Sequence, residues 1–400
     1  MKKDRIESLD LVRGIALIFI IFFHSSIYNF ANIHKIDFSN PPIFIVLMSF
    51  MALWGGIFIL YSMAVNSYMI AKRSEEEVLK KTFLMLTYAA LFYIAVHYAL
   101  NLALGRWNVD FVNNMPHMTM VAATIRNGCF TLPSRLKFFD GSSISTILSN
   151  ILIVGWLLYF LLKRKTSLET IYSMLAISGT AVIMFSFVRV FLFKYCDNAA
   201  SSGNWILGTI YSFILANPYP IITYVSYGLF GALLGLLIYN DRRDLMKKIL
   251  LPIGGMLFLF GISGMAMFDK TISKPDFFWY FKTNFELGFF LFSITLIYLF
   301  FEGRKKLLSK LSFISNFSRI SLTVYLLEVT LSEILGKGAG MIFPDWNQTI
   351  NGALLFGFVN VCVWLAIVAL WSRAKFKYSL EYFWVKLFKR LGKDSTKIMN

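Results

Sequence analysis

The chain has 400 residues, of which 57% are hydrophobic and 15% are charged, and its mean hydropathy is +0.64. A soluble domain usually carries about a quarter charged residues, and several apolar runs here reach the roughly 20 residues that cross a bilayer. The net charge of +17 lies in short loops between the apolar runs, as in cytoplasmic loops, so it argues against a nucleic-acid partner. These features exclude a soluble protein, and the lack of period-two strands argues against a membrane barrel.

The predicted fold class is all-α: a polytopic integral membrane helical bundle of about ten spans, with both termini in the cytoplasm. The amino terminus is basic, and each predicted inner loop is rich in Lys or Arg, which agrees with this orientation. The predicted location is the plasma or inner membrane. The predicted spans are residues 11–31, 43–71, 82–104, 144–162, 168–193, 219–239, 249–268, 277–301, 319–336 and 350–371.

Four segments are expected outside the bilayer core. Residues 105–143 form the longest connection, and we expect residues 115–128 to form a short interfacial helix or to dip into the membrane. Residues 204–216 are apolar but short and precede two prolines, which favours an outer or half-membrane helix. A Gly-rich outer loop follows the ninth span. The basic, aromatic tail, residues 373–400, is expected to lie on the cytoplasmic surface, beside a membrane domain of residues 1–372.

The first span carries three polar side chains on one stripe. Arg13 and His24 are eleven residues apart, which leaves a residual turn of about 20° and a separation of roughly 16 Å along the helix axis. Asp10 lies three residues before Arg13, on nearly the same stripe. Polar groups within lipid usually face the bundle interior or a water-filled cavity. This stripe is therefore the first candidate for a functional site.

Each of these side chains has two interpretations. An imidazole at His24 is able to act as a general base near neutral pH, or it hydrogen-bonds across helices as a neutral group. Asp10 and Arg13 form either a cap and surface ion pair or a site in which Arg13 holds an anionic group such as a phosphate.

Other candidates lie in later spans and outer loops. Glu286, Glu328 and Glu333 lie within the eighth and ninth spans, and both structural pairing and a catalytic role are open for them. His97 and Asn101 are favoured as a helix–helix hydrogen-bonding pair, and His97 is also a candidate on the acceptor side.

On the outer side, His34 and His117 are candidates for binding a polar acceptor. No metal site is indicated, because Cys129, Cys196 and Cys362 form no metal or redox motif. A disulfide between Cys129 and Cys196 is left open, and no cleavable signal peptide is expected.

The segment SLDLVRGIALIFIIFFH, residues 8–24, resembles the first helix of the transmembrane acyltransferase superfamily. This superfamily includes the acyltransferase-3 proteins and the heparan-alpha-glucosaminide N-acetyltransferase-like group. Arg13 and His24 meet the acyltransferase-3 pattern of Arg, ten residues and His. Residues 318–331 are similar to the penultimate signature of that family, and residues 376–391 to the end of its YeiB-like members.

Some positions depart from the family patterns. Glu328 stands where acyltransferase-3 members commonly have His, and Met63 follows Ser62 where a glycine is usual. In the glucosaminide group Asn replaces the histidine at position 24, and the working histidine follows in the outer loop, roughly where His34 lies. The subfamily therefore stays open.

The resemblance implies transfer of an acyl group, expected to be acetyl, from cytoplasmic acyl-CoA to an extracytoplasmic glycan or glycolipid. His24 would be the general base, oriented by Arg13, Asp10 or a nearby carboxylate, Glu286 or Glu328. Positive charge at the inner mouth would bind the phosphates of the donor. The residues that supply this charge are Arg13, Lys72, Arg73, Lys305, Lys306 and Arg319. Membrane lipids are further expected partners, and a homodimer is left open.

Two other functions remain open at this point. A proton-coupled secondary transporter or flippase would use His24, Glu286 and Glu328 as a proton relay. Internal inverted repeats would favour it, and the sequence contains none that is convincing. In the third hypothesis, a structural or sensory membrane protein, the polar residues only hold helices together.

Overall fold

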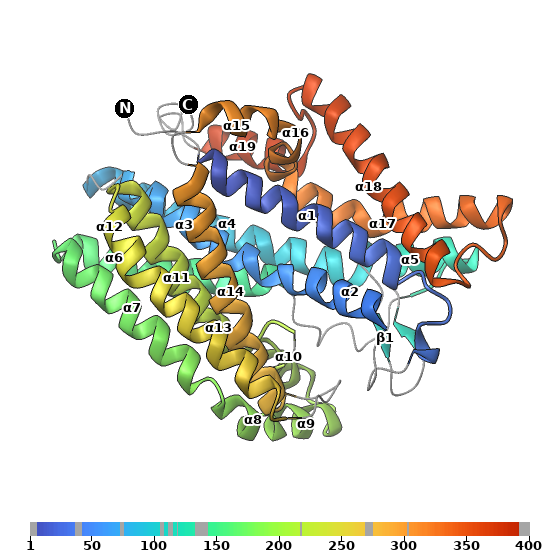
Figure 1. Cartoon of the computed structure of the whole chain (residues 1–400), viewed down its shortest axis with the longest axis horizontal. Helices are drawn as coiled ribbons and strands as arrows, with labels where there is room; N and C mark the ends of the chain where they lie inside the picture. The colour runs from blue at the N-terminus through green and yellow to red at the C-terminus, as the bar shows by residue number, and fades with distance from the viewer. Residues whose placement is uncertain are drawn as a thin grey trace. The chain divides into compact units, whose positions relative to one another are not determined.

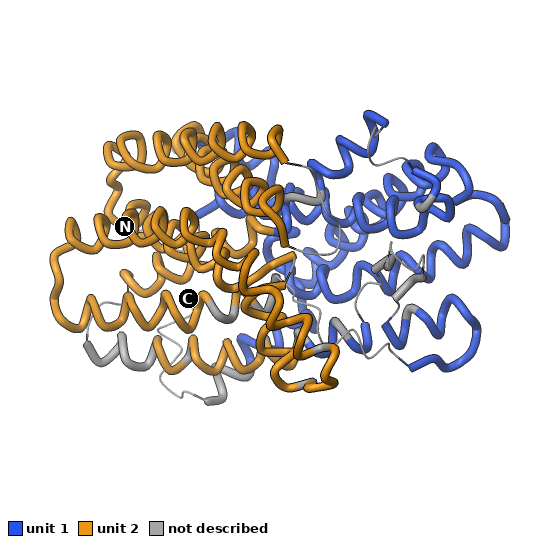
Figure 2. Tube along the Cα trace, turned by 90° about the horizontal axis from the view of Figure 1, so that it is seen from below, with its two compact units in different colours: residues 1–55, 98–137, 301–400 blue, residues 56–97, 138–300 orange. Residues whose placement is uncertain are grey.

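The chain folds into two compact units, which Figure 2 colours separately. Unit 1 comprises residues 1–55, 98–137 and 301–400, and unit 2 comprises residues 56–97 and 138–300. This computed structural model describes residues 6–36, 42–72, 76–104, 108–110, 115–117, 119–132, 143–216, 218–268, 275–301 and 304–391. The two units are a division by packing, so the expected boundary between a membrane domain and a tail after residue 372 stays a prediction.

Unit 1 is built around α1 (Glu7–Ile27), which packs against α17 (Ser321–Ile342) and α18 (Ile350–Arg373) (Figure 1). A short antiparallel pair of strands places Asn108 opposite His117. The remaining elements of the unit are η1 (Ile33–Lys35), α2 (Ile43–Leu53), the π-helix η3 (Ala99–Leu104), β1 (Asn108–Asp110), β2 (Met115–His117), α5 (Met120–Asn127), α15 (Lys305–Lys310), α16 (Ser312–Ser315), η6 (Phe317–Ile320) and α19 (Leu380–Leu391).

Small residues let α1 approach its neighbours closely. A Cβ at Gly14 would lie 2.2 Å from the backbone oxygen of Ile314, and one at Gly357 would lie 1.9 Å from Oγ of Ser26. Helices in membranes associate largely through such close packing, because lipid offers no hydrophobic driving force between them. Gly14 and Gly357 therefore fix the distance of α1 from α16 and from α18.

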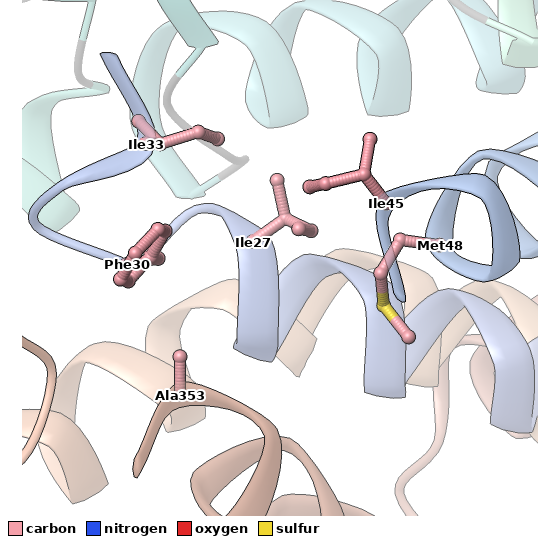
Figure 3. Packing of buried hydrophobic residues seen from close by; sticks show 6 residues of the cluster. All are labelled: Ile27, Phe30, Ile33, Ile45, Met48 and Ala353. Carbon is pink, nitrogen blue, oxygen red and sulfur yellow. The ribbon is translucent and has the colours of Figure 1, made fainter. Parts of the chain in front are cut away.

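The carboxyl end of α1 is held by a hydrophobic cluster (Figure 3). The cluster joins α1 and the turn after it to α2 and the first turns of α18. Its buried members are Ile27, Phe30, Ile33, Ile45, Met48 and Ala353. This packing positions the last turn of α1, which carries His24.

Unit 2 is built around α11 (Ile221–Tyr239), which is buried along almost its whole length and packs against α3, α6 and α7. A Cβ at Gly235 would lie 2.1 Å from the backbone oxygen of Ala64 on α3, so this contact requires glycine. The other elements are α3 (Ile57–Lys72), most of α4 (Glu76–Tyr98), α6 (Ser143–Lys163), α7 (Leu168–Phe185), α8 (Val188–Leu192), α9 (Lys194–Ser201), α10 (Trp205–Leu215), α12 (Arg243–Leu245), the π-helix η5 (Met246–Leu250), α13 (Leu251–Met265) and α14 (Phe277–Phe301).

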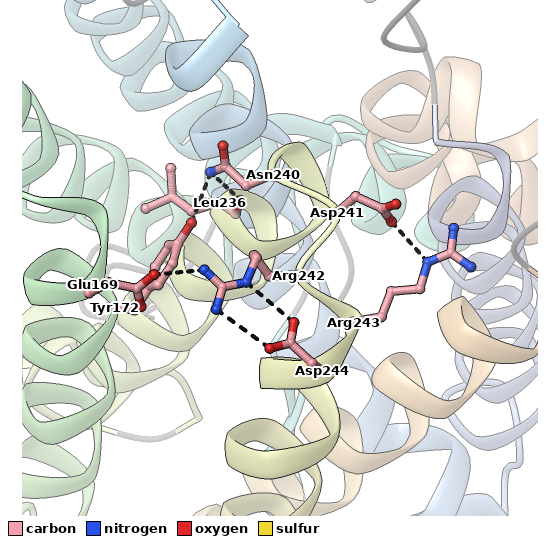
Figure 4. Close-up of polar contacts among 8 residues, drawn as sticks. All are labelled: Glu169, Tyr172, Leu236, Asn240, Asp241, Arg242, Arg243 and Asp244. Carbon is pink, nitrogen blue, oxygen red and sulfur yellow. Dashed lines mark hydrogen bonds and ion pairs between the residues drawn. The ribbon is translucent and has the colours of Figure 1, made fainter.

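The turn after α11 is polar (Figure 4). Arg242 donates to Glu169 at 2.7 Å, and this bond raises the pKa of the guanidinium further above its ordinary value. Asn240 donates to the hydroxyl of Tyr172 at 2.9 Å. Both side chains of the Arg242–Glu169 pair are accessible to solvent, where water and salt screen an ion pair, so this pair contributes little to stability.

Seven helical segments among the described residues are long and apolar enough to cross a membrane, which identifies a membrane-embedded, mainly helical protein. They are Glu7–Ile27, Ile43–Lys72, Leu168–Phe185, Ile221–Tyr239, Arg243–Met265, Phe277–Phe301 and Ile350–Arg373. The predicted number of ten spans and the location of the termini stay predictions.

Several predicted spans are not continuous α-helices; the third, for example, passes into the π-helix η3 at Ala99. The second is interrupted by a 3₁₀ turn, η2 (Trp54–Gly56), because its two consecutive glycines are poor helix formers. The fifth ends at Phe185, after which α8 and α9 continue the chain as short helices. Apolar composition predicts burial in lipid, but it does not predict these local breaks.

Two smaller expectations also differ from the structure, and a third is confirmed. Most of the expected Gly-rich outer loop, up to Ile342, instead forms the last part of α17, and Trp346, which follows this helix, packs beside Gly336 and Gly340. Only part of the segment 115–128 is helical, because its first residues pair as β2 and α5 begins at Met120. The short helix expected at residues 204–216 is confirmed as α10.

Candidate functional site

A buried histidine–carboxylate pair joins α1 to α17. Nδ1 of His24 lies 2.5 Å from Oε1 of Glu328, and the two side chains are 7% and 4% exposed. The other carboxylate oxygen, Oε2 of Glu328, is buried and has no hydrogen-bond partner among the described residues. An unpartnered buried acceptor costs about 1–3 kcal/mol, so this oxygen is a natural place for a ligand donor.

The pair sets the chemistry of the imidazole. With Glu328 ionised, Nδ1–H of His24 donates to Oε1, which leaves Nε2 with the lone pair of the neutral ring. Tyr28, which caps the carboxyl end of α1, stacks on the imidazole with ring centroids 5.2 Å apart. Glu328 and Tyr28 thus hold both the tautomer and the plane of the ring, as a general base requires.

A second polar network lies one turn further along both helices. Arg126 on α5 donates to both carboxylate oxygens of Glu333, at 2.8 and 3.2 Å. The same guanidinium donates to Oδ1 of Asn29 at 3.3 Å, and Nδ2 of Asn29 donates to Ser332 at 3.1 Å. These bonds join α5, α17 and the end of α1 beside the histidine.

A small cavity separates the two networks. Its volume is about 10 Å³, which is room for about one water-sized group. The residues around it are His24, Tyr28, Asn29, Glu328, Val329, Ser332 and Glu333. Most of the exposed lining of the cavity is apolar, but the cavity brings the imidazole together with five groups able to form hydrogen bonds.

At the other end of α1, Asp10 and Arg13 bind the segment that precedes α17. Nε of Arg13 donates to Oγ of Ser318 at 2.8 Å, and the Ser318 hydroxyl in turn donates to Asp10. Arg13 also bonds the backbone oxygen of Ser318. Since Ser318 and Glu328 lie on consecutive elements, Arg13 and His24 share the face of α1 that their spacing predicts.

The expected cap at the start of α1 is wrong. The helix begins at Glu7, four residues earlier than predicted, and its N-cap residue is Ile6 without a side-chain cap. Asp10 is therefore inside the helix and buried, and its side chain lies 3.9 Å from that of Arg13. The role of Arg13 in holding an anionic group stays a prediction.

The basic residues expected at the donor end are only partly described. Lys306 and Arg319 are exposed in unit 1, and Lys72 ends α3 in unit 2. Arg73 lies outside the described residues, as does the side chain of Lys305. Their predicted role in donor binding is untested.

Glu286 has a separate environment in unit 2. Its carboxylate accepts from Tyr224 at 3.1 Å and from Tyr227 at 3.4 Å, and it forms an ion pair with Lys282. Lys282 also lies 4.4 Å from the ring centroid of Trp279. Each of these partners belongs to unit 2, so Glu286 is buried in a hydrogen-bonded network of its own.

The three histidines expected on the acceptor side have described backbones only. His34 lies in η1, His97 in α4 and His117 in β2, and their side chains are outside the described residues. The predicted pairing of His97 with Asn101 crosses into the π-helix that begins at Ala99, where the α-helical spacing no longer applies.

Several residues around the cavity were not predicted. Asn29 follows His24 by five residues, as Glu333 follows Glu328, and this repeated spacing on two helices is the signal that would have connected them. Arg126 comes from the long connection between spans, where no periodicity indicates the direction of a side chain. Tyr28 resembles the many aromatic residues at helix ends.

Among the described residues, no group of His, Cys, Asp and Glu side chains is arranged to hold a metal ion, and Cys129, Cys196 and Cys362 are free thiols. No protein-family model matches the chain, and no curated protein matches it significantly. The fold and the site thus define a helical membrane protein with a buried His–Glu pair beside a small cavity.

Proposed function

We propose that the protein is a membrane acyltransferase. It moves an acyl group, expected to be acetyl, from cytoplasmic acyl-CoA to a hydroxyl or amine of an extracytoplasmic glycan or glycolipid. The observation that carries the proposal is the buried pair of His24 and Glu328 beside a cavity for one small polar group. The resemblance of residues 8–24 and 318–331 to transmembrane acyltransferases supports it, because these segments contain or adjoin that pair.

In the proposed reaction, Nε2 of His24 takes the proton of the acceptor hydroxyl while its oxygen attacks the carbonyl carbon of the thioester. The new C–O bond forms, the C–S bond breaks, and the coenzyme A thiolate leaves. The imidazolium then returns the proton to the thiolate. Glu328 stabilises the imidazolium through Nδ1–H and does not itself need to be protonated.

The donor is proposed to approach from the amino-terminal end of α1. Arg13, Lys306 and Arg319 all belong to unit 1 and would neutralise its phosphates. The thioester must then reach His24, which is eleven residues or roughly 16 Å away. A cavity of about 10 Å³ admits no pantetheine arm, so donor binding is proposed to separate α1 from α17 beside His24.

The proposed topology has ten spans in the plasma or inner membrane, with both termini in the cytoplasm. Seven spans have the candidate helices given above. Two others coincide with the shorter apolar helices Leu86–Val96 and Asn150–Lys163. The last is α17, whose apolar character is reduced by three charged residues, Glu328, Glu333 and Lys337.

Purified protein in lipid nanodiscs, given acetyl-CoA and a soluble sugar, tests the proposal through release of coenzyme A thiol. Replacing the imidazole in His24→Ala is expected to lower turnover by about 10²–10⁴-fold, the usual contribution of a general base. A matched control, Arg242→Gln, removes an exposed ion pair of unit 2 and should leave turnover unchanged. Full turnover by a folded His24→Ala protein would show that the catalytic assignment is wrong.

A further inference from the structure

Arg126 binds two of the residues that line the cavity, Asn29 and Glu333. Arg126 is 32% exposed, whereas the carboxylate of its partner Glu333 is 6% exposed. The guanidinium therefore lies between solvent and two residues that line the cavity, Asn29 and Glu333. The fork geometry of arginine lets one side chain hold both of these residues.

Inside, the cavity offers groups for a hydroxyl. Oε2 of Glu328 is buried without a partner among the described residues, so it is available to accept a hydrogen bond. The hydroxyl of Ser332 and the imidazole of His24 also line the cavity, and the volume of about 10 Å³ matches one hydroxyl group or one water. No thioester or sugar ring fits there, so only the reacting group of an acceptor is able to enter.

The groups that Arg126 holds suit the rest of such an acceptor. The carboxylate of Glu333 offers two hydrogen-bond acceptors, and the amide of Asn29 offers one acceptor and donors. Two adjacent hydroxyls of a sugar ring are able to donate to and accept from such groups. Tyr28 adds an aromatic face at the same cavity. A few placed polar groups beside an aromatic ring are typical of small-ligand sites.

We propose that Arg126 is the gate of a hydroxyl-binding subsite for the acceptor, a neutral polyhydroxylated ring. Without acceptor, Arg126 holds Glu333 and Asn29 and closes the cavity. The ring replaces Arg126 on these two residues, and its reacting hydroxyl occupies the cavity between His24 and Glu328. This inference rests on the proposed acyl transfer for the use of the subsite, but the gate and the binding of the ring are measurable without any acyl-CoA.

The test follows the reaction of His24 with diethyl pyrocarbonate in the full-length protein in nanodiscs, by mass spectrometry of the peptide that contains His24. Arg126→Gln removes the fork and is expected to speed the reaction about tenfold, since a bidentate pair no longer closes the cavity. Arg126→Lys keeps the positive charge but loses the two-pronged guanidinium, so its reaction rate should lie between those of the wild type and Arg126→Gln. Arg242→Gln is the control for loss of an exposed Arg–Glu pair and should react like the wild type.

A second arm of the experiment adds a ligand. Methyl β-D-glucopyranoside should protect His24 in the wild type, and tetrahydropyran, which has the ring without hydroxyls, should not. The double variant Arg126→Gln with Glu333→Gln leaves no unpaired buried charge, so it replaces Arg126→Gln in both arms of the experiment if the single variant does not fold. It is expected to react fast and to lose protection by the glucoside.

An unchanged rate in the folded Arg126 variants, or equal protection by tetrahydropyran, would overturn the gate and the subsite. The outcome for acyl transfer is separate. If the glucoside protects His24 from diethyl pyrocarbonate but the protein transfers no acyl group, the subsite is supported and the proposed function is wrong. Acyl transfer whose KM for the sugar does not depend on Arg126 keeps the function and removes the gate.

Discussion

Each unit of the molecule buries a carboxylate on a long helix, and the two carboxylates are bonded in opposite ways. Glu286 in unit 2 has partners on both oxygens, with Lys282 on Oε1 and Tyr224 and Tyr227 on Oε2. Glu328 in unit 1 has His24 on Oε1, and Oε2 is without a partner among the described residues. Both carboxylates are almost fully buried, at 2% and 4% exposed.

This difference distinguishes a structural carboxylate from one that is prepared for a ligand. A buried charge is stable only when it is paired and hydrogen-bonded, and the partners of Glu286 meet that need. Among the described residues, one oxygen of Glu328 has no hydrogen-bond partner and lies beside a cavity, and the other is bonded to a base, His24. We infer that the function depends on Glu328, and that Glu286 mainly holds α14 to α11.

The largest effect is expected from Glu328→Gln. The amide keeps the size of the side chain but removes the charge that stabilises the imidazolium of His24 and selects its tautomer. We expect kcat for acyl transfer to fall by about 10²–10⁴-fold. Steady-state kinetics of thiol release measure this, with thermal unfolding to show that the fold is kept. A variant with normal kcat would place Glu328 among the structural residues and remove the contrast with Glu286.

Glu286→Gln should have the opposite profile. Lys282 loses its charged partner, although the ring of Trp279 still lies 4.4 Å away, and the two tyrosine hydroxyls lose a charged acceptor. We expect unfolding to become easier by about 1–3 kcal/mol, the cost of disturbing buried polar groups, while turnover stays close to that of the wild type. Denaturant unfolding and kinetics on the same sample measure both. A fall in kcat with unchanged stability would instead make Glu286 the catalytic carboxylate that the sequence left open.

The sequence predicts much of the fold, because long apolar runs show directly which residues must be shielded from water. The spans expected at 277–301 and 219–239 correspond to α14 and α11 within two residues. The turn at Trp54–Gly56 and the early start of α1 at Glu7 were not predicted. These details depend on close packing, such as that of Gly14 against Ile314, which hydrophobicity does not reveal.

The sequence identifies the residues of the candidate site, but it does not show which of them form hydrogen bonds with one another. His24 and Glu328 are each recognisable as polar groups in apolar helices, but 304 residues separate them. Glu286 has the same sequence context as Glu328, so only the contacts distinguish them. Arg126 belongs to a connection without periodicity, and its bond to Glu333 follows from the packing of α5 on α17.

The smallest effect concerns how α17, and therefore Glu328, is held in place. Glu381 on α19 accepts hydrogen bonds from the backbone N–H groups of Leu322 and Thr323, at 2.7 and 3.3 Å, and from the hydroxyl of Thr323 at 2.5 Å. Its negative charge thus satisfies donors at the amino end of α17, where a carboxylate is favoured. Thr323 in turn accepts from the N–H of Leu380, so the contact is reciprocal.

Glu381→Gln keeps the oxygen that caps α17 but removes the charge. We expect a loss of about 0.5–2 kcal/mol in stability, as for other helix caps, and a decrease in kcat below tenfold, because Glu328 lies less than two turns further along the same helix. Thermal unfolding and kinetics measure the two effects, and Thr323→Ser is the matched control because it retains the hydroxyl. If kcat falls as far as in Glu328→Gln, the position of α17 limits the reaction as strongly as the charge of Glu328 does. The difference between Glu286 and Glu328 would then arise from where their helices are held more than from their hydrogen bonds.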